Sequence, residues 1–252
     1  MATNPDKILL VTGGSRGIGA AVCRRAGREG YAVAVNYLRD KEAADAVVAD
    51  IVAAGGTAVA IQADVAQEGE IERLFAETDR RLGRLTHFLN NAGITGRSQR
   101  LDQVDAATLR AVFDLNILGA FLCAQAAVKR MSTKHGGSGG AIVNLSSAAA
   151  NLGAPGEFIW YAASKGAIDS LTIGLAKEVA REGIRVNAVA PGMIDTEIHA
   201  SSGDPGRVDR IVPMVPAGRI GTADEVAQSV MFLLSDASSY CTGTIIRVAG
   251  GR

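Results

Sequence analysis

Near its start, the chain places a glycine-rich turn between an apolar run and an amphipathic segment. Residues 7–12 form the apolar run, which suits a buried strand, and residues 20–28 read as a helix with Val22 and Ala26 facing inward. Residues 13–19 between them read Gly-Gly-Ser-Arg-Gly-Ile-Gly. Glycines let the backbone approach a pyrophosphate closely, and a helix N-terminus offers free N–H groups to an anion. The pattern therefore predicts a phosphate-binding turn, with a tight turn that binds nothing as the alternative.

The alternation of strand and helix continues along the whole chain. Further runs typical of strands lie at residues 31–36, 57–62, 85–89, 141–145, 184–189 and 244–248. Helical spacing occupies residues 41–54, 68–82, 109–129 and 161–181 and begins again at residue 222. Strands separated by helices indicate a mostly parallel sheet covered on both faces. We therefore expect one α/β domain over residues 1–252, a doubly wound Rossmann fold with about seven strands.

The composition excludes several classes of function. Lys and Arg together equal Asp and Glu, so the net charge is zero, and no basic stripe indicates a nucleic-acid partner. No uninterrupted apolar run reaches the ~18 residues of a membrane helix, and the first residues lack the pattern of a signal peptide. The three cysteines, Cys23, Cys123 and Cys241, lie far apart in the sequence, so we interpret them as reduced thiols of a cytoplasmic protein. The three histidines form no metal-spaced pair, and we expect no metal site.

Tyr161 and Lys165 form the pair with the clearest chemical meaning. They are four residues apart, so on a helix they share one face. A cation beside a phenol favours the phenolate and lowers the phenol pKa, which suits the phenol for proton transfer near neutral pH. A surface Tyr beside a solvated Lys would give the same pattern. The functional interpretation of the pair therefore depends on the motifs elsewhere in the chain.

Polar or turn-forming residues follow several of the predicted strands. Asn91-Ala92-Gly93 follows the fourth strand, and Ser146-Ser147 follows the fifth. In an open parallel sheet, ligands bind in the crevice at the carboxyl ends of the strands. Asn116 lies inside the apolar stripe of the predicted helix at 109–129. Its amide either bonds to a neighbouring backbone carbonyl or holds water near a site, and the sequence favours neither.

Together these features resemble the classical short-chain dehydrogenase/reductase family, over essentially the whole chain. The similarity is greatest to the branch of 3-oxoacyl-carrier-protein reductases and glucose dehydrogenases. The resemblance rests on motifs in the family's order: the glycine turn, Asp64, residues 90–93, Asn116, Ser147, the pair Tyr161 and Lys165, and Pro191-Gly192.

The resemblance implies four catalytic residues. Tyr161 would be the acid/base, and Lys165 would hold the nicotinamide ribose and lower the phenol pKa. Ser147 would bond to the substrate oxygen, and Asn116 would anchor a water of a proton relay. Ser147 precedes Tyr161 by fourteen residues, slightly more than is usual in the family, so Ser146 is kept as the alternative to Ser147.

The resemblance also implies a nicotinamide cofactor lying across the strand ends. The residues implied at its phosphates are Gly13, Ser15, Arg16, Gly17, Ile18 and Gly19. Those implied around its adenosine are Asn36, Tyr37, Arg39, Asp64, Val65, Asn91, Ala92 and Gly93. Those implied at its nicotinamide end are Tyr161, Lys165, Pro191, Gly192, Ile194 and Thr196.

The end of the second strand favours NADP(H) over NAD(H). An acidic residue at this position accepts from the ribose 2′-hydroxyl and repels a 2′-phosphate, but the chain has Asn36 and Tyr37 there. Arg16 and Arg39 stand nearby, and arginines bind phosphate strongly. For Arg39, a surface charge paired with Asp40 is an equally good interpretation.

The substrate is expected to be a medium-sized or bulky carbonyl compound. In the family, specificity lies after Pro191-Gly192, here about residues 193–216, and in the loop before Tyr161. These segments have an apolar character that comes from Ile159, Trp160, Ile194, His199, Met214 and Val215.

The main expectation is a cytoplasmic carbonyl reductase or alcohol dehydrogenase that forms a homotetramer, as the family commonly does. Two other functions stay open. An extended-type sugar-nucleotide epimerase or dehydratase would share the Tyr and Lys spacing but would have a larger C-terminal domain. An NADP(H)-binding sensor without turnover would typically lack the Tyr or the Lys.

Overall fold

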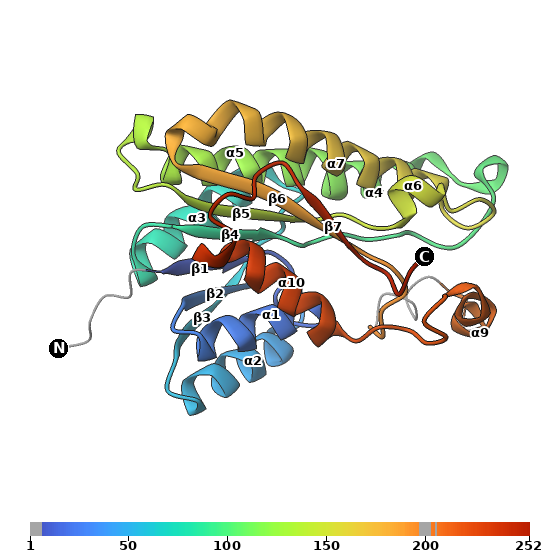
Figure 1. The fold of residues 1–252 in the computed structure, drawn as a ribbon, viewed down its shortest axis with the longest axis horizontal. Helices are drawn as coiled ribbons and strands as arrows, with labels where there is room; N and C mark the ends of the chain where they lie inside the picture. Colours follow the sequence, from blue (N-terminus) through green and yellow to red (C-terminus); the bar gives the residue numbers. More distant parts are fainter. Residues whose placement is uncertain (1–6, 197–202, 205) are drawn as a thin grey trace.

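The computed structural model describes residues 7–196, 203–204 and 206–252, and a parallel seven-stranded sheet forms the centre of this part of the chain (Figure 1). The order across the sheet is β3-β2-β1-β4-β5-β6-β7. The strands are β1 Ile8–Val11, β2 Ala32–Tyr37, β3 Thr57–Gln62, β4 His87–Asn90, β5 Gly140–Leu145, β6 Ile184–Pro191 and β7 Ile245–Val248. The predicted doubly wound parallel fold is thereby confirmed.

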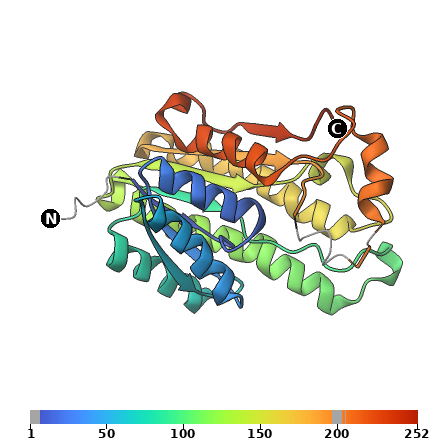
Figure 2. The same cartoon turned by 90° about the horizontal axis from the view of Figure 1, so that it is seen from below.

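Helices cover both faces of the sheet. Figures 1 and 2 show α1 Gly17–Arg28, α2 Lys41–Ala53 and α10 Ala223–Leu234 on one face. The other face carries α3 Glu68–Leu82, α5 Ala120–Met131 and α7 Ile159–Val179. Shorter helices are α4 Ala106–Phe113, α6 Ala149–Leu152 and α9 Arg207–Ile211.

The alternation of side chains along the strands builds two separate cores. Leu9 and Val11 of β1 pack with α1, α2 and α10, whereas Ile8 and Leu10 pack with α3, α5 and α7. Successive residues of a strand point to opposite faces, so a strand buried on both sides must be apolar at every position. This explains why β1 reads as a continuous apolar run.

The predicted helix at 109–129 is interrupted. A π-helical turn, Asp114–Gly119, separates α4 from α5 and carries Asn116. A π turn holds more residues than an α turn, so it rotates the faces of the helix on either side of it. An unbroken apolar stripe over residues 109–129 would include Phe113 and Phe121, and this expectation is wrong because both side chains are exposed.

The stretch Ala106–Met131, which includes this turn, is long and apolar enough to cross a membrane by length and composition alone. Cys123, Ala127 and Met131 of this stretch are buried against the sheet and its neighbouring helices. The stretch therefore packs as a core helix of this fold.

The segment around residues 193–216 is more regular than its sequence indicates. It contains α9 and a following 3₁₀ turn, Val212–Met214, and Ile211 and Val215 pack on Met193. Residues 197–202 and 205, among them His199, lie outside the described residues. Pro191 belongs to β6, so that strand continues two residues beyond the predicted end.

Candidate active site

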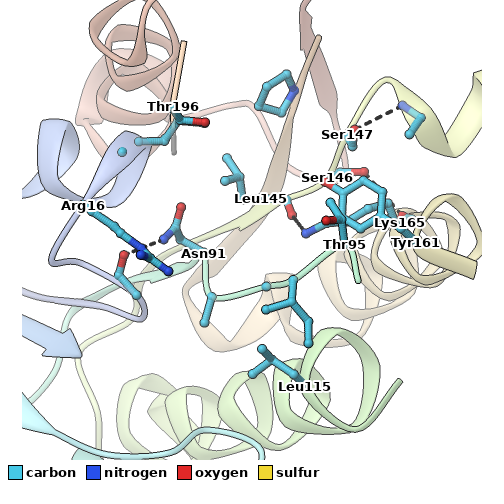
Figure 3. A pocket seen from close by; sticks show the side chains of 18 of the residues that line it. Arg16, Asn91, Thr95, Leu115, Leu145, Ser146, Ser147, Tyr161, Lys165 and Thr196 are labelled. Carbon is cyan, nitrogen blue, oxygen red and sulfur yellow. Dashed lines mark hydrogen bonds between the residues drawn. The ribbon is translucent and has the colours of Figure 1, made fainter. Parts of the chain in front are cut away.

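A cleft of about 870 Å³ lies at the carboxyl ends of the strands. The strand order reverses between β1 and β4, and such a reversal is where open α/β sheets bind ligands. Figure 3 shows Arg16 and Asn91 toward one end of the cleft and Ser147, Tyr161 and Lys165 toward the other. The cleft is lined by Ser147 and by every residue implied for the cofactor except Gly19, whereas Asn116 lies behind its wall.

The glycine turn has the backbone geometry that its sequence indicates. Gly13 and Gly17 have φ of +63° and +53°, in the left-handed region where glycine carries no penalty. A Cβ on Gly19 would lie 2.4 Å from the carbonyl oxygen of Gly13, so only glycine fits there. Arg16 is the N-cap residue of α1, and its side chain forms no capping hydrogen bond to the first turn of that helix. The N–H groups of the first turn of a helix suit an anion such as a pyrophosphate.

Thr12 and Asn91 join the end of β1 to the end of β4. The Thr12 hydroxyl accepts from the N–H groups of Asn91 (2.9 Å) and Ala92 (3.1 Å). In return, the Asn91 side-chain amide donates to the carbonyls of Thr12 (2.8 Å) and Gly13 (3.0 Å). Asn91 thus lines the cleft and also fixes the shape of the glycine turn.

Asn36, near the end of β2, bonds to the backbone of the glycine turn and of the segment at the end of β3. Its amide oxygen accepts from Gly13 N–H (3.1 Å), and its amide nitrogen donates to the carbonyls of Ile61 (3.3 Å) and Ala63 (3.1 Å). Its side chain is buried. Arg16 and Arg39 also line the cleft.

Asp40, the possible partner of Arg39, has a structural task of its own. Its carboxylate accepts from Ala43 N–H (2.9 Å) and so caps the N-terminus of α2. A carboxylate at this position also interacts favourably with the helix dipole. In the same region, the Asp64 carboxylate accepts from Ala66 N–H (2.9 Å) just after β3.

Lys165 is buried beside Tyr161. Its ammonium donates to the Leu145 carbonyl (2.6 Å) and lies 5.7 Å from the centre of the Tyr161 ring. Burial lowers the pKa of Lys165 to about 8, against the opposing charge of Asp169. Lys165 therefore loses its proton more easily than an ordinary lysine, and it lines the cleft.

The expected lowering of the Tyr161 pKa by Lys165 is wrong for this structure. Burial raises the pKa of Tyr161, and the Ser147 side chain and the charge of Arg207 act in the opposite direction. The Lys165 ammonium is directed at the Leu145 carbonyl, so burial dominates the ionisation of the phenol.

The two serines after β5 have different surroundings. Ser147 Oγ accepts from Ala149 N–H (3.1 Å) and lines the cleft beside Tyr161. Ser146 is buried, and its hydroxyl donates to the Asp169 carboxylate. This geometry favours Ser147 over Ser146 as the group that meets a substrate.

Asn116 is bonded to the backbone of the neighbouring Ile94. Its amide nitrogen donates to the Ile94 carbonyl (2.8 Å) and to Ser164 Oγ (3.1 Å), and its oxygen accepts from Ile94 N–H (2.9 Å). A Cβ on Gly93 would lie 3.2 Å from this oxygen and 3.6 Å from Lys165 Nζ. Asn116 therefore fixes the segment that passes Lys165, and its role in a water relay stays a prediction.

Glu157, Phe158 and Arg207 line the cleft but were not predicted as site residues. Arg207 of α9 forms an ion pair with Glu157 (3.0 Å) and lies over the ring of Phe158. Arg207 is fifty residues from Glu157 in the sequence, so no local pattern indicates the pair.

The predicted apolar substrate residues are mostly elsewhere. Among those in the described part of the chain, only Ile194 lines the cleft. Trp160 is buried in a cluster with Val112 and Phe158, and its indole donates to the Thr95 carbonyl (2.8 Å), whereas Met214 is exposed. The start of α7 directs successive side chains around the helix, so neighbours of Tyr161 do not share its direction. Other apolar residues of the cleft lining include Ile94, Leu115, Leu152, Phe158 and Met193.

A parallel sheet with reversed strand order, a glycine turn at the reversal and a Ser, Tyr and Lys cluster beside it defines the class of dinucleotide-dependent oxidoreductases. A family model described as Enoyl-(Acyl carrier protein) reductase matches residues 13–252. The chain belongs to the short-chain dehydrogenase/reductase family and resembles its 3-oxoacyl-carrier-protein reductase branch.

Several relatives are similar over almost their full length. The chain is 52% identical to the uncharacterized oxidoreductase YgfF of Escherichia coli, over 97% of this chain and 99% of the relative. It is 40% identical to a 3-oxoacyl-[acyl-carrier-protein] reductase of Synechocystis, over 97% and 96% of the two chains. The crystal structure of levodione reductase superposes with a TM-score of 0.89 at 31% identity, covering 99% of this chain and 98% of that one.

Proposed function

We propose that residues 1–252 form one NADP(H)-dependent carbonyl reductase or alcohol dehydrogenase domain, with Tyr161 as its acid/base. One observation carries the proposal. Ser147, Tyr161 and Lys165 meet at one end of a cleft whose other end holds the glycine turn and Arg16. A hydride carrier that spans the cleft would place its reactive end beside the three polar side chains.

The cleft suits a nicotinamide dinucleotide. The glycine turn and the N-terminus of α1 offer N–H groups to the pyrophosphate, and Arg16 and Arg39 offer cations to a 2′-phosphate. Asp64, Val65 and Ile194 also line the cleft, and Thr196 lies beside Gly17 of the glycine turn. Bound there, the cofactor supplies or accepts the hydride.

Ser147 and Tyr161 act on the oxygen of the substrate. Both hydroxyls donate to a carbonyl oxygen and stabilise the negative charge that grows on it during reduction. Tyr161 then gives its proton to that oxygen, and the reverse transfer serves alcohol oxidation. The positive charge of the oxidised nicotinamide would favour the phenolate as it forms.

Asn116 and Lys165 support this chemistry. Asn116 holds Ile94 and thereby the backbone that passes Lys165. We propose that this neighbourhood carries the water that resupplies the proton through Lys165. Lys165 also binds the nicotinamide ribose hydroxyls.

The substrate is a medium-sized or bulky carbonyl compound or the matching alcohol. The support is the apolar part of the cleft lining, which includes Leu152, Met193 and Phe158, whose ring contacts that of Tyr161. Two relatives are named as reductases of a 3-oxoacyl chain and of levodione, and such substrates would fit this lining. We propose a cytoplasmic location, which the free cysteines support. We also propose a homotetramer, which the exposed apolar side chains of Leu118 and Phe121 support.

The test is NADPH oxidation with a panel of ketones and diketones, in the wild type and in Tyr161→Phe. The variant removes only the phenol hydroxyl, so we expect unchanged NADPH binding and a kcat at least about tenfold lower, equivalent to roughly 1.4 kcal/mol of barrier. Tyr240→Phe is the matched control, because Tyr240 is fully exposed and outside the cleft.

Other outcomes would contradict the proposal. A kcat within tenfold of wild type in Tyr161→Phe would remove the acid/base role. NADPH binding without turnover on any carbonyl would favour a sensor, and isomerisation of a sugar nucleotide without net NADPH oxidation would favour an epimerase.

A further inference from the structure

Arg207 and Glu157 form a largely buried ion pair at the edge of the cleft. The guanidinium Nε and Nη2 both donate to one Glu157 oxygen, at 3.1 and 3.0 Å. Their side chains are only 13% and 19% exposed. Arg207 is the first residue of α9, and Glu157 lies two residues before α7 begins. The pair therefore joins the segment after β6 to the start of the helix that carries Tyr161.

Phe158 connects this pair to Tyr161. The Arg207 guanidinium lies over the Phe158 ring, 4.8 Å from its centre. The Phe158 ring meets the Tyr161 ring edge to face, with centres 5.7 Å apart and planes at 87°. Phe158 is buried, so it cannot move without disturbing both neighbours. Phe158 thus contacts both Arg207 and Tyr161.

The charge of Arg207 also reaches the phenol. It lowers the pKa of Tyr161, against the effect of burial. Other ionisable groups near this end of the cleft, within the described residues, include Lys165 and Asp169 on α7, Glu157 itself and Arg252. Segments 91–95 and 145–148, which also line the cleft, contain no ionisable side chain.

A second ion pair lies on the outer side of α9. Arg210 bonds to Asp204 and is 55% exposed, and it approaches Glu157 only to 3.9 Å. It shares the helix and the charge of Arg207 but lines no part of the cleft. Arg210 is therefore a control of the same charge on the same helix, which is more exposed and does not contact Phe158 within the described contacts.

We propose that Arg207 is a positioning residue for Tyr161, which acts through its ion pair with Glu157 and its contact with Phe158. The pair fixes the start of α7 and sets the charge that the phenol experiences. The inference rests on the proposed function, because it gives Arg207 a role only through the proton transfer by Tyr161.

The test is the ionisation of Tyr161, measured without turnover. Tyrosinate absorbance near 295 nm is followed as the pH rises, and each variant is compared with the same variant carrying Tyr161→Phe, so that the difference isolates this phenol. In Arg207→Gln, the loss of a cation should move the midpoint to higher pH. Arg207→Lys should keep the midpoint near that of the wild type, and Arg210→Gln should leave it unchanged.

Glu157→Gln provides the opposite change. Removal of the anion leaves the cation of Arg207 less compensated, so the midpoint should move to lower pH. In alcohol oxidation at neutral pH, where only the phenolate accepts the proton, Arg207→Gln should lower kcat at least about threefold. The NADPH dissociation constant should stay that of the wild type in each Arg207 and Glu157 variant.

Unchanged midpoints in both Arg207→Gln and Glu157→Gln, or shifts in the same direction, would overturn the inference. If Arg207→Gln does not fold, Glu157→Gln and Arg207→Lys still decide it. The titration reports on the phenol whether or not the enzyme turns over. Failure of the proposed function would appear instead as retained activity in Tyr161→Phe.

Discussion

The Lys165 ammonium donates a 2.6 Å hydrogen bond to the backbone carbonyl of Leu145, at the carboxyl end of β5. This bond holds a cation inside the protein, where Lys165 is only 5% exposed. A buried charge disfavours the folded state unless its partners compensate for lost hydration, and here burial brings the pKa of Lys165 from 10.5 to about 8. The buried cation of Lys165, which binds the cofactor in our proposal, therefore lowers the free energy of unfolding.

The first prediction concerns stability against pH. Between pH 8 and 10.5 the unfolded chain holds the Lys165 proton while the folded chain releases it, so the contribution of this group to stability rises with pH across that window. The cost of burying the cation is fully present below pH 8 and is gone above 10.5. From pH 7.5 to 9.5, the free energy of unfolding of the wild type should rise by about 2 kcal/mol relative to Lys165→Met.

Urea unfolding of both proteins at the two pH values, at equal protein concentration, measures this difference. Lys177→Met is the control, because Lys177 is an exposed lysine on the same helix. An equal pH dependence for wild type and Lys165→Met would show that Lys165 keeps its proton throughout and that its burial has no such cost.

The second prediction separates the two serines after β5. Ser147→Ala should lower kcat about a hundredfold, as loss of one donor to a developing oxyanion does, with NADPH binding unchanged. Ser146→Ala leaves the partly buried Asp169 without its hydroxyl donor, so it should cost about 1–3 kcal/mol of unfolding free energy and less than tenfold in kcat. Steady-state kinetics and urea unfolding measure the two effects, and a larger loss of kcat in Ser146→Ala would reassign the substrate contact.

The third prediction concerns assembly. Leu118 and Phe121 are 53% and 41% exposed and lie three residues apart on the outer side of the α4–α5 helix. Burying large apolar side chains of this kind in an interface stabilises it by about 1.5–3 kcal/mol each. Light scattering should give the mass of a tetramer for the wild type and a smaller mass for Leu118→Asp/Phe121→Asp. Val52→Asp, which changes an exposed apolar residue on α2, should stay tetrameric, and a monomeric wild type would end the proposal.

The fold and much of the cleft could be predicted because their signals are local. The glycine turn, Asn91 and Ser147 each follow directly after a strand, so the sheet topology alone brings them together. The π turn at Asn116 could not be predicted from apolar periodicity, because that periodicity assumes an unbroken helix.

Two features of the candidate site depend on distant parts of the chain. The Tyr161 pKa is set largely by burial, which a four-residue spacing to Lys165 does not report. The contact of Arg207 with Glu157 and Phe158 depends on how α9 packs against the start of α7. Such contacts follow from tertiary packing, and no motif marks them in advance.

The last prediction concerns the choice of cofactor. Arg16 lies in the glycine turn and lines the cleft together with Arg39, and no acidic residue occupies the end of β2, where Asn36 and Tyr37 stand. A charged hydrogen bond to a 2′-phosphate contributes about 1.5–3 kcal/mol, which corresponds to roughly ten- to a hundredfold in affinity. Arg16→Ala should therefore raise KM for NADPH at least about tenfold and leave KM for NADH nearly unchanged, because NADH lacks the phosphate.

Arg24→Ala is the matched control for this loss of charge. Arg24 lies on the same helix, is paired with Asp50 at 2.7 Å and does not line the cleft, so KM for both cofactors should stay that of the wild type. Steady-state kinetics with each cofactor at a saturating ketone concentration give the four comparisons. If Arg16→Ala weakened both cofactors equally, the arginine would serve the pyrophosphate that they share. A wild-type preference for NADH would mean that Arg16 and Arg39 do not select the 2′-phosphate at all.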